Sequence, residues 1–459
     1  MTISFEKYIK SFDERANKYI PPKKEWTPSD YATYGVKDLY KISVKEANKL
    51  KLDSIKFLFN RHYKSNRFYN GFCKDKKVKP DDIKTMKDLE KIPLIPGDFY
   101  KNYPSGRDFA LWLANLFTGD IPQIKIKGKE PTYDDVINAF NSSGLAITYS
   151  SGTSGKHTFI PRDLRTFNIA EYLLAKVAAT MIYPLWNPKM KGYLLMPNPY
   201  KTNVMAGRAA EIYYDIVDDV RAAIDREINT EIIRKSMISA TEKGVKSSIV
   251  SYARKRMYKK MVNDIISWLE RNEKQKNSIA LVGAPFILFL VMNKLKENGQ
   301  TFDFSGKGGI ITGGGWKVQE DKRMPVVEFR ETVQEVLGIK PEHCLDGYGM
   351  VEGNGWMIHC PEGHYFHIPH SYYHAMVLDE ELEPVGYDEY GRFAFLDGST
   401  ISYPGFIITG DRVKMHERCP VCDRPGPVLE PEVTRVVGKE MRGCAEEVRK
   451  MMSVDMGSD

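Results

Sequence analysis

The chain has 459 residues, of which 42% are hydrophobic and 28% charged, a size and composition that allow a large core in two or three domains. It contains no apolar run near the roughly 18 residues that a membrane-spanning helix needs, its first residues do not form a signal peptide, and its six cysteines are too few for a disulfide scaffold. We therefore expect a cytoplasmic protein with no transmembrane segment.

The first 100 residues contain 22 Lys and Arg residues against 14 Asp and Glu residues, a net charge of +8, whereas the rest of the chain has a net charge of −1. We take residues 1–105 as a basic, mostly helical N-terminal region that ends in a proline-punctuated stretch. A second basic cluster, residues 253–260, lies inside a predicted helical stretch, residues 230–273. A solvated helix face explains such clusters, and docking of an acidic protein is the alternative.

The most informative motif is residues 146–161, where β-branched runs at 146–149 and 158–161 predict two strands. Between them, glycines let backbone N–H groups turn toward an anion, and hydroxyl groups and a lysine add donors. The spacing is not that of a Walker loop, and a strand rather than a helix follows. We predict a polyphosphate-binding loop, with a solvated hairpin as the alternative. Its residues are Ser150, Ser151, Gly152, Thr153, Ser154, Gly155 and Lys156.

Apolar runs at 192–196, 279–282 and 309–312 alternate with helical periodicity, a pattern typical of α/β proteins. Gly314 and Gly315 follow the last run, where glycines let a ligand approach the backbone, although a tight turn also explains them. After about residue 360, short aromatic-rich strands predict a β-rich subdomain. The expected division is thus 1–105, an α/β core at 106–358, and a β-rich region with a short C-terminal helix at 359–459.

Three further motifs follow the loop in order: residues 313–317 (Gly-Gly-Gly-Trp-Lys), 346–352 (Asp-Gly-Tyr-Gly-Met-Val-Glu) and 407–411 (Ile-Ile-Thr-Gly-Asp). With the stretch that ends in Phe99-Tyr100-Lys101, they resemble the acyl-adenylate-forming superfamily, in particular LuxE-type acyl-protein synthetases and phenylacetate-CoA ligase. The resemblance covers residues 40–445. It implies mixed sheets with packed helices and a β-rich subdomain, and a ligase that uses ATP and Mg²⁺.

The resemblance also implies roles for single residues. The loop would hold the phosphates, and Gly314 and Gly315 would border the adenine and the acyl pocket. Tyr348 would lie against the adenine, and Gly349, next to it, would also belong to the cofactor-binding residues. Glu352 would reach Mg²⁺, for which a carboxylate oxygen is a suitable ligand, and Asp411 would accept hydrogen bonds from the ribose hydroxyls. Val351 departs from the family pattern, which usually has a threonine at this position.

The cysteines suggest a second kind of site. A CxxC pair, Cys419 and Cys422, together with Cys360 and His364 supplies four ligands of the types that a structural zinc prefers. His359 and His367 are rival ligands. A redox role for the CxxC pair would need a strand-to-helix context, which is missing.

The end of the sequence distinguishes the branches of the family. Little sequence follows Asp411, so we expect the usual mobile C-terminal domain to be lacking, as in LuxE-type proteins, which hold the acyl group on a cysteine near the C-terminus. Cys444, in Arg-Gly-Cys-Ala, resembles that cysteine. A helix start and a nearby arginine would lower its pKa, which favours the nucleophilic thiolate. A small buried residue is the alternative.

The sequence therefore predicts an AMP-forming ligase that converts a fatty or aryl carboxylic acid into an acyl-AMP and passes the acyl group to a thiol, Cys444. Lys156, Lys317 and Lys439 are the candidate catalytic lysines. An acyl reductase or acyl carrier protein would then be the partner, and no nucleic acid is expected. One alternative is an acyl- or aryl-CoA ligase, with CoA as the acceptor. The other is a zinc-knuckle module that binds nucleic acid or protein, which would not turn over ATP.

Overall fold

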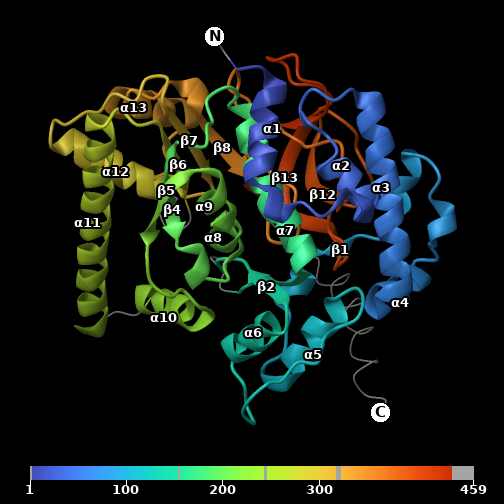
Figure 1. Ribbon diagram of the computed structural model, residues 1–459. Helices are drawn as coiled ribbons and strands as arrows, with labels where there is room; N and C mark the ends of the chain where they lie inside the picture. The colour runs from blue at the N-terminus through green and yellow to red at the C-terminus, as the bar shows by residue number, and fades with distance from the viewer. Residues whose placement is uncertain (1–2, 153–155, 242–244, 317–321, 437–459) are drawn as a thin grey trace.

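The computed structural model describes residues 3–152, 156–241, 245–316 and 322–436, with side chains left undescribed between 236 and 254 (Figure 1). The α-helices are α1 (Phe5–Arg15), α2 (Pro28–Thr33), α3 (Val44–Ser65), α4 (Arg67–Asp75), α5 (Gly106–Leu116), α6 (Tyr133–Ser142), α7 (Leu164–Met181), α8 (Met205–Arg208), α9 (Tyr213–Ile216), α10 (Thr230–Thr241), α11 (Val245–Lys274), α12 (Pro285–Glu297) and α13 (Val326–Leu337). No described helix is both long enough and apolar enough to cross a membrane.

The strands are β1 (Ile95–Pro96), β2 (Leu145–Tyr149), β3 (Phe159–Asp163), β4 (Lys191–Pro197), β5 (Asp218–Ile224), β6 (Ile279–Gly283), β7 (Gly308–Gly313), β8 (Cys344–Tyr348), β9 (Met357–His359), β10 (Phe366–His367), β11 (Tyr373–Leu378), β12 (Tyr390–Asp397), β13 (Phe406–His416), β14 (Val428–Leu429) and β15 (Thr434–Arg435). The predicted strands at 146–149, 192–196, 279–282 and 309–312 lie within these elements, and the predicted strand at 158–161 begins one residue before β3.

Most strands join one mixed sheet in the order β11-β12-β13-β14-β10-β9-β8-β7-β6-β4-β5, with β1 and β15 also paired to β13. The strands β5-β4-β6-β7-β8 are parallel. Parallel neighbours need crossover connections, and helices such as α12 and α13 supply them. From β8 to β11 the neighbours in this order are antiparallel, whereas β1 pairs with β13 in parallel. The predicted α/β fold with a β-rich later part is confirmed.

The helix α7 connects the N-terminal helices to the rest of the molecule. It is buried along most of its length, and in Figure 1 it lies with α1 between the parallel strands and the strands β12 and β13. The Tyr8 hydroxyl of α1 donates to the carbonyl of Ala179 at 2.7 Å, and Lys176 Nζ donates to the carbonyl of Val36 at 2.7 Å. One hydrophobic cluster extends from Tyr8 to Leu429. The domain limits at 105 and 358 stay a prediction, and the expected C-terminal helix lies outside the described residues.

The topology fixes where a ligand site forms. β7 and β8 are adjacent and parallel, so the segments that follow them emerge at the same edge of the sheet. Ligands of α/β sheets bind at the carboxyl ends of such strands. The separate β2–β3 hairpin and the strand β13 also contribute residues to this edge, since both line the cavity described below.

Candidate active site

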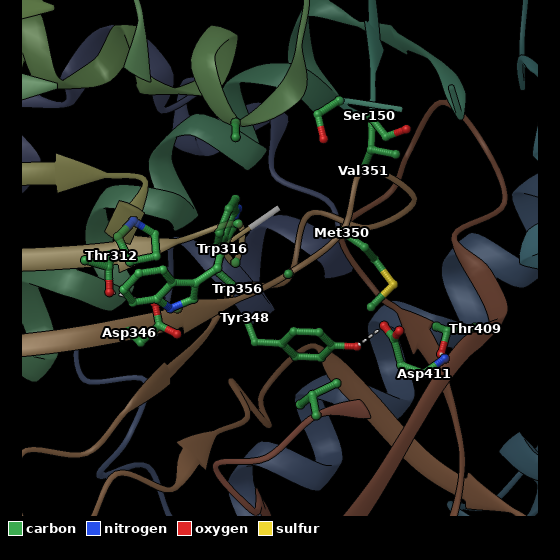
Figure 2. A pocket seen from close by; sticks show the side chains of 18 of the residues that line it. Ser150, Thr312, Trp316, Asp346, Tyr348, Met350, Val351, Trp356, Thr409 and Asp411 are labelled. Carbon is green, nitrogen blue, oxygen red and sulfur yellow. Dashed lines mark hydrogen bonds between the residues drawn. The ribbon is translucent and has the colours of Figure 1, made fainter. Parts of the chain in front are cut away.

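A cavity of about 760 Å³ lies at the carboxyl ends of β7 and β8. Its walls include residues 150–152, 314–316, 346–352 and 409–411, so the structure brings together parts of all four motifs that the sequence singled out. Figure 2 shows Tyr348 and Asp411 pointing toward one another at one side. At the other side lie Thr312, Trp316, Asp346 and Trp356.

The β2–β3 hairpin presents the predicted phosphate loop to the cavity. Its strands pair from Leu145 with Asp163 to Tyr149 with Phe159. Past the last pair, the Ser150 N–H donates to the carbonyl of Thr158 at 3.0 Å, and the Thr158 N–H donates to Ser150 Oγ at 2.9 Å. Thr153, Ser154 and Gly155 lie outside the described residues. Lys156 is exposed and is not part of the cavity wall.

Tyr348 and Asp411 form the best-defined polar contact of the cavity. The Tyr348 hydroxyl donates to Asp411 Oδ2 at 2.6 Å (Figure 2). Arg435 of β15 lies 3.1 Å from the other carboxylate oxygen. The Asp411 N–H donates to Thr409 Oγ1 at 3.0 Å. Burial, with a smaller contribution from Asp411, holds the pKa of Tyr348 well above its usual value. The ring and the carboxylate are thus held in fixed positions by hydrogen bonds within the protein.

Glu352 lies on the cavity wall next to the hairpin. Burial raises the pKa of its carboxyl group, and a hydrogen bond from the Thr158 hydroxyl and the charge of Lys101 lower it by smaller amounts. Lys101 belongs to the short 3₁₀-helix Gly97–Lys101 and is the only lysine of the cavity wall among the described residues. Sequence reasoning missed Thr158 and Lys101 as site residues, although it had noted the Phe-Tyr-Lys segment that contains Lys101.

The opposite end of the cavity is lined by polar groups from β7, β8 and α13. The Thr312 hydroxyl donates to Asp346 Oδ1 at 2.7 Å, and burial raises the pKa of Asp346. The guanidinium of Arg330 is buried here and lies 3.1 Å from His359 Nδ1. Burial raises the pKa of the Cys344 thiol to about 12, so this thiol is neutral at physiological pH. No motif in the sequence had marked Arg330.

The Cys/His cluster differs from the expectation in one ligand. The structure places Cys360, His367, Cys419 and Cys422 so that their ligand atoms all lie within 4.8 Å of one another. The Cys360 and Cys419 sulfurs are 3.9 Å apart, and Cys422 Sγ is 3.3 Å from His367 Nε2. Hydrogen bonds, the largest from Cys360, hold the pKa of Cys422 well below its usual value. Three thiols and an imidazole are ligands that zinc prefers.

The structure does not place His364, the expected fourth ligand, in this cluster. This residue lies in a turn with φ +67°, and its Nε2 is 3.1 Å from Arg330. His367 instead lies on β10, between β9 and β14, and faces the 419–422 turn. The pairing of β10 with β9 and β14 brings His367, and not His364, to the cysteines. The spacing of residues in the sequence does not reveal which strands pair.

Besides Thr153, Ser154 and Gly155, three further residues that the sequence named lie outside the described residues. They are Cys444, Lys317 and Lys439. Their roles stay predictions.

Comparisons with known proteins agree with this geometry. Residues 229–453 match the family described as acyl-protein synthetase, LuxE. The chain is 26% identical over 407 residues to the long-chain-fatty-acid–luciferin-component ligase of Vibrio harveyi, covering 88% of each chain. It is 24% identical over 406 residues to the corresponding ligase of Aliivibrio fischeri, covering 88% of this chain and 89% of the other.

The fold resembles that of solved adenylate-forming ligases. The 2-hydroxyisobutyryl-CoA ligase in the postadenylation state, in complex with 2-HIB-AMP, superposes with a TM-score of 0.56 and 13% identity, covering 92% of this chain and 75% of the other. An open conformation of that ligase gives a TM-score of 0.55 and 13% identity, covering 86% of this chain and 71% of the other. With these findings, residues 229–453 of the chain match the LuxE acyl-protein synthetase family, and the chain has the fold of the solved adenylate-forming ligases.

Proposed function

We propose that this ligase activates a long-chain fatty acid as its acyl-AMP and transfers the acyl group to the thiol of Cys444. The observation that carries the proposal is the single cavity in which the hairpin loop, Glu352 and the Tyr348–Asp411 pair face one another. The two curated relatives, both long-chain-fatty-acid ligases, support the choice of acid.

In the first step the carboxylate of the acid attacks the α-phosphorus of ATP, and pyrophosphate leaves. Backbone N–H groups and hydroxyls of residues 150–152 bind phosphate oxygens, and Lys101 adds a positive charge on the same side of the cavity. Asp411 accepts hydrogen bonds from the ribose, and the ring of Tyr348 lies against the base. These groups are in place before the reaction, so they stabilise the developing charge without rearranging.

Glu352 fits the role of a ligand to Mg²⁺. It offers hard carboxylate oxygens on the cavity wall, and its raised pKa indicates that no cation in the described protein compensates its charge fully. The metal, when bound, would neutralise phosphate charge.

Apolar side chains form the wall that would receive the acyl chain. They come from the start of α12, from α13 and its approach, and from α8, and include Pro285, Trp316, Met324, Val326, Phe329 and Met205. Burial of methylene groups against such a wall contributes about 0.8 kcal/mol each, so a fatty acid gains more from it than a short acid.

Cys344 is the competing thiol, since it lines the cavity. Its pKa of about 12 leaves almost no thiolate at neutral pH, and the thiolate is the nucleophile. This favours Cys444 as the acceptor.

Mass spectrometry tests the proposed function. The enzyme is incubated with ATP, Mg²⁺ and a mixture of C8–C18 fatty acids and aryl acids without CoA, in unsubstituted form and as Cys444→Ala and Cys344→Ala. We expect a fatty acyl mass on the peptide that contains Cys444, absent only from Cys444→Ala. An unmodified protein that forms acyl-AMP and releases AMP when CoA is added would replace the proposal with a CoA ligase.

We also propose that Cys360, His367, Cys419 and Cys422 bind one structural zinc ion. The 3.9 Å separation of two sulfurs is close to the roughly 3.8 Å expected between thiolates on a tetrahedral zinc with bonds of about 2.3 Å. Four protein ligands leave no open position, so the ion would be structural.

The zinc content of the purified protein tests this site. We expect about one zinc per chain in the unsubstituted protein and in His364→Ala, and a loss of zinc in His367→Ala and Cys419→Ser. Zinc lost from His364→Ala but retained in His367→Ala would contradict the ligand set.

A further inference from the structure

His157 contacts the phosphate loop without being part of the cavity wall. Its Nδ1 lies 2.7 Å from the carbonyl oxygen of Ser150. A carbonyl can only accept, so Nδ1 carries the proton and donates it. His157 is not part of the cavity wall, whereas Ser150 and Ser151 are.

This hydrogen bond determines how the Ser150–Ser151 peptide is turned. In a trans peptide the C=O and the following N–H point in opposite directions. Because the Ser150 carbonyl is directed to His157, the Ser151 N–H is directed away from the histidine, and Ser151 itself lines the cavity. A flipped peptide would instead present a carbonyl oxygen to the phosphates and repel them.

The imidazole is itself held in place by its neighbours. Its ring packs against Tyr149 and Phe159, with centroid distances of 5.1 and 5.7 Å. Its backbone N–H donates to the Tyr103 hydroxyl at 3.3 Å. These contacts with both strands of the hairpin and with Tyr103 hold the imidazole ring in one position.

Gly152 lies directly over this ring. It has φ +69°, in the left-handed region, and a Cβ added here would lie 2.7 Å from His157 Nδ1. Gly152 is thus required by the backbone conformation and, separately, by the ring beneath it.

We propose that His157 is a positioning residue that sets the phosphate loop for ATP, by its hydrogen bond to Ser150 and by its ring beneath Gly152. The inference rests on the proposed role of the loop in binding phosphates. It assigns to His157 the orientation of the loop, and no contact with substrate.

Calorimetric titration of the whole enzyme with ATP and Mg²⁺ tests the hydrogen bond. We expect His157→Ala and His157→Phe to weaken ATP binding about tenfold, because one partly buried hydrogen bond and the order of the loop are lost. His157→Asn, whose amide nitrogen can occupy the position of Nδ1, should stay within about threefold of the unsubstituted enzyme. His343→Ala, which removes a histidine outside the cavity, is the matched control, and thermal unfolding verifies that each variant is folded.

A double-substitution cycle tests the ring. Gly152→Ala should weaken ATP binding in the unsubstituted enzyme and in the His157→Ala background. The fold-change should be at least about five times smaller in the His157→Ala background, because only the backbone strain remains there. Equal effects in both backgrounds, or His157→Ala and His157→Phe within twofold of the unsubstituted enzyme, would overturn the inference while leaving the proposed function intact. An unsubstituted enzyme that does not bind ATP would refute the proposed function itself.

Discussion

Arg162 of β3 connects the hairpin to the segment that contains Glu352, and its replacement by lysine should be costly. The side chain is fully buried. Its guanidinium donates to five groups: Thr148 Oγ1 at 2.6 Å, Asn354 Oδ1 at 3.1 Å, the carbonyls of Val351 at 2.6 Å and Gly353 at 3.2 Å, and the Tyr403 hydroxyl at 2.9 Å. These bonds hold residues 351–354 against the hairpin.

The magnitude follows from the number of acceptors. A lysine has three donors on one nitrogen, so Arg162→Lys leaves at least two of the five acceptors without a partner. Each unpaired buried acceptor costs about 1–3 kcal/mol. We therefore expect Arg162→Lys to lower the free energy of unfolding by about 2–6 kcal/mol. It should also reduce acid-dependent ATP turnover, because Glu352 lies in the released segment.

Urea unfolding followed by tryptophan fluorescence measures the difference, with Arg107→Lys as the matched control. Arg107 is exposed and donates to the carbonyls of Ile126 and Gly128 at the surface, so its replacement should change the stability by no more than about 0.5 kcal/mol. If Arg162→Lys unfolds within about 1 kcal/mol of Arg107→Lys, the reasoning about unpaired acceptors is refuted.

Two further predictions concern carboxylates. Asp411→Asn should raise the KM for ATP about 10- to 100-fold in steady-state assays, since hydrogen bonds to a charged acceptor contribute about 1.5–3 kcal/mol; a change below twofold would contradict its assignment to the ribose. Burial raises the pKa of Glu171 to about 9, so the folded chain keeps a proton that the unfolded chain releases above pH 4.5. Its contribution to stability is full below that pH and is lost as the pH rises toward 9. Between pH 6 and 8 the unsubstituted protein should lose about 3 kcal/mol relative to Glu171→Gln in urea unfolding; parallel pH profiles would contradict this.

The strands and the order of the motifs could be predicted because they depend on local pattern. Apolar runs such as 279–282 and 309–312 are buried on both faces in a parallel sheet, and the sequence shows this directly. The sequence could name Tyr348, Glu352 and Asp411 because each of them lies in a motif made of consecutive residues.

Other features depend on contacts between distant segments, which residue spacing does not contain. The choice of His367 over His364 follows from the pairing of β10 with β9 and β14. Arg435 reaches Asp411 only because β15 pairs with β13. Lys101 lies in the cavity because β1, next to it in the chain, also pairs with β13.

The central claim is that the cavity forms an acyl-AMP from ATP and a fatty acid. The most direct test is the exchange of labelled pyrophosphate into ATP, which requires that pyrophosphate leave and return at the α-phosphorus. We expect exchange that depends on a fatty acid, needs no CoA, and is strongly reduced in Asp411→Asn at the same ATP concentration. An absence of acid-dependent exchange, or release of ADP and phosphate instead, would contradict the account.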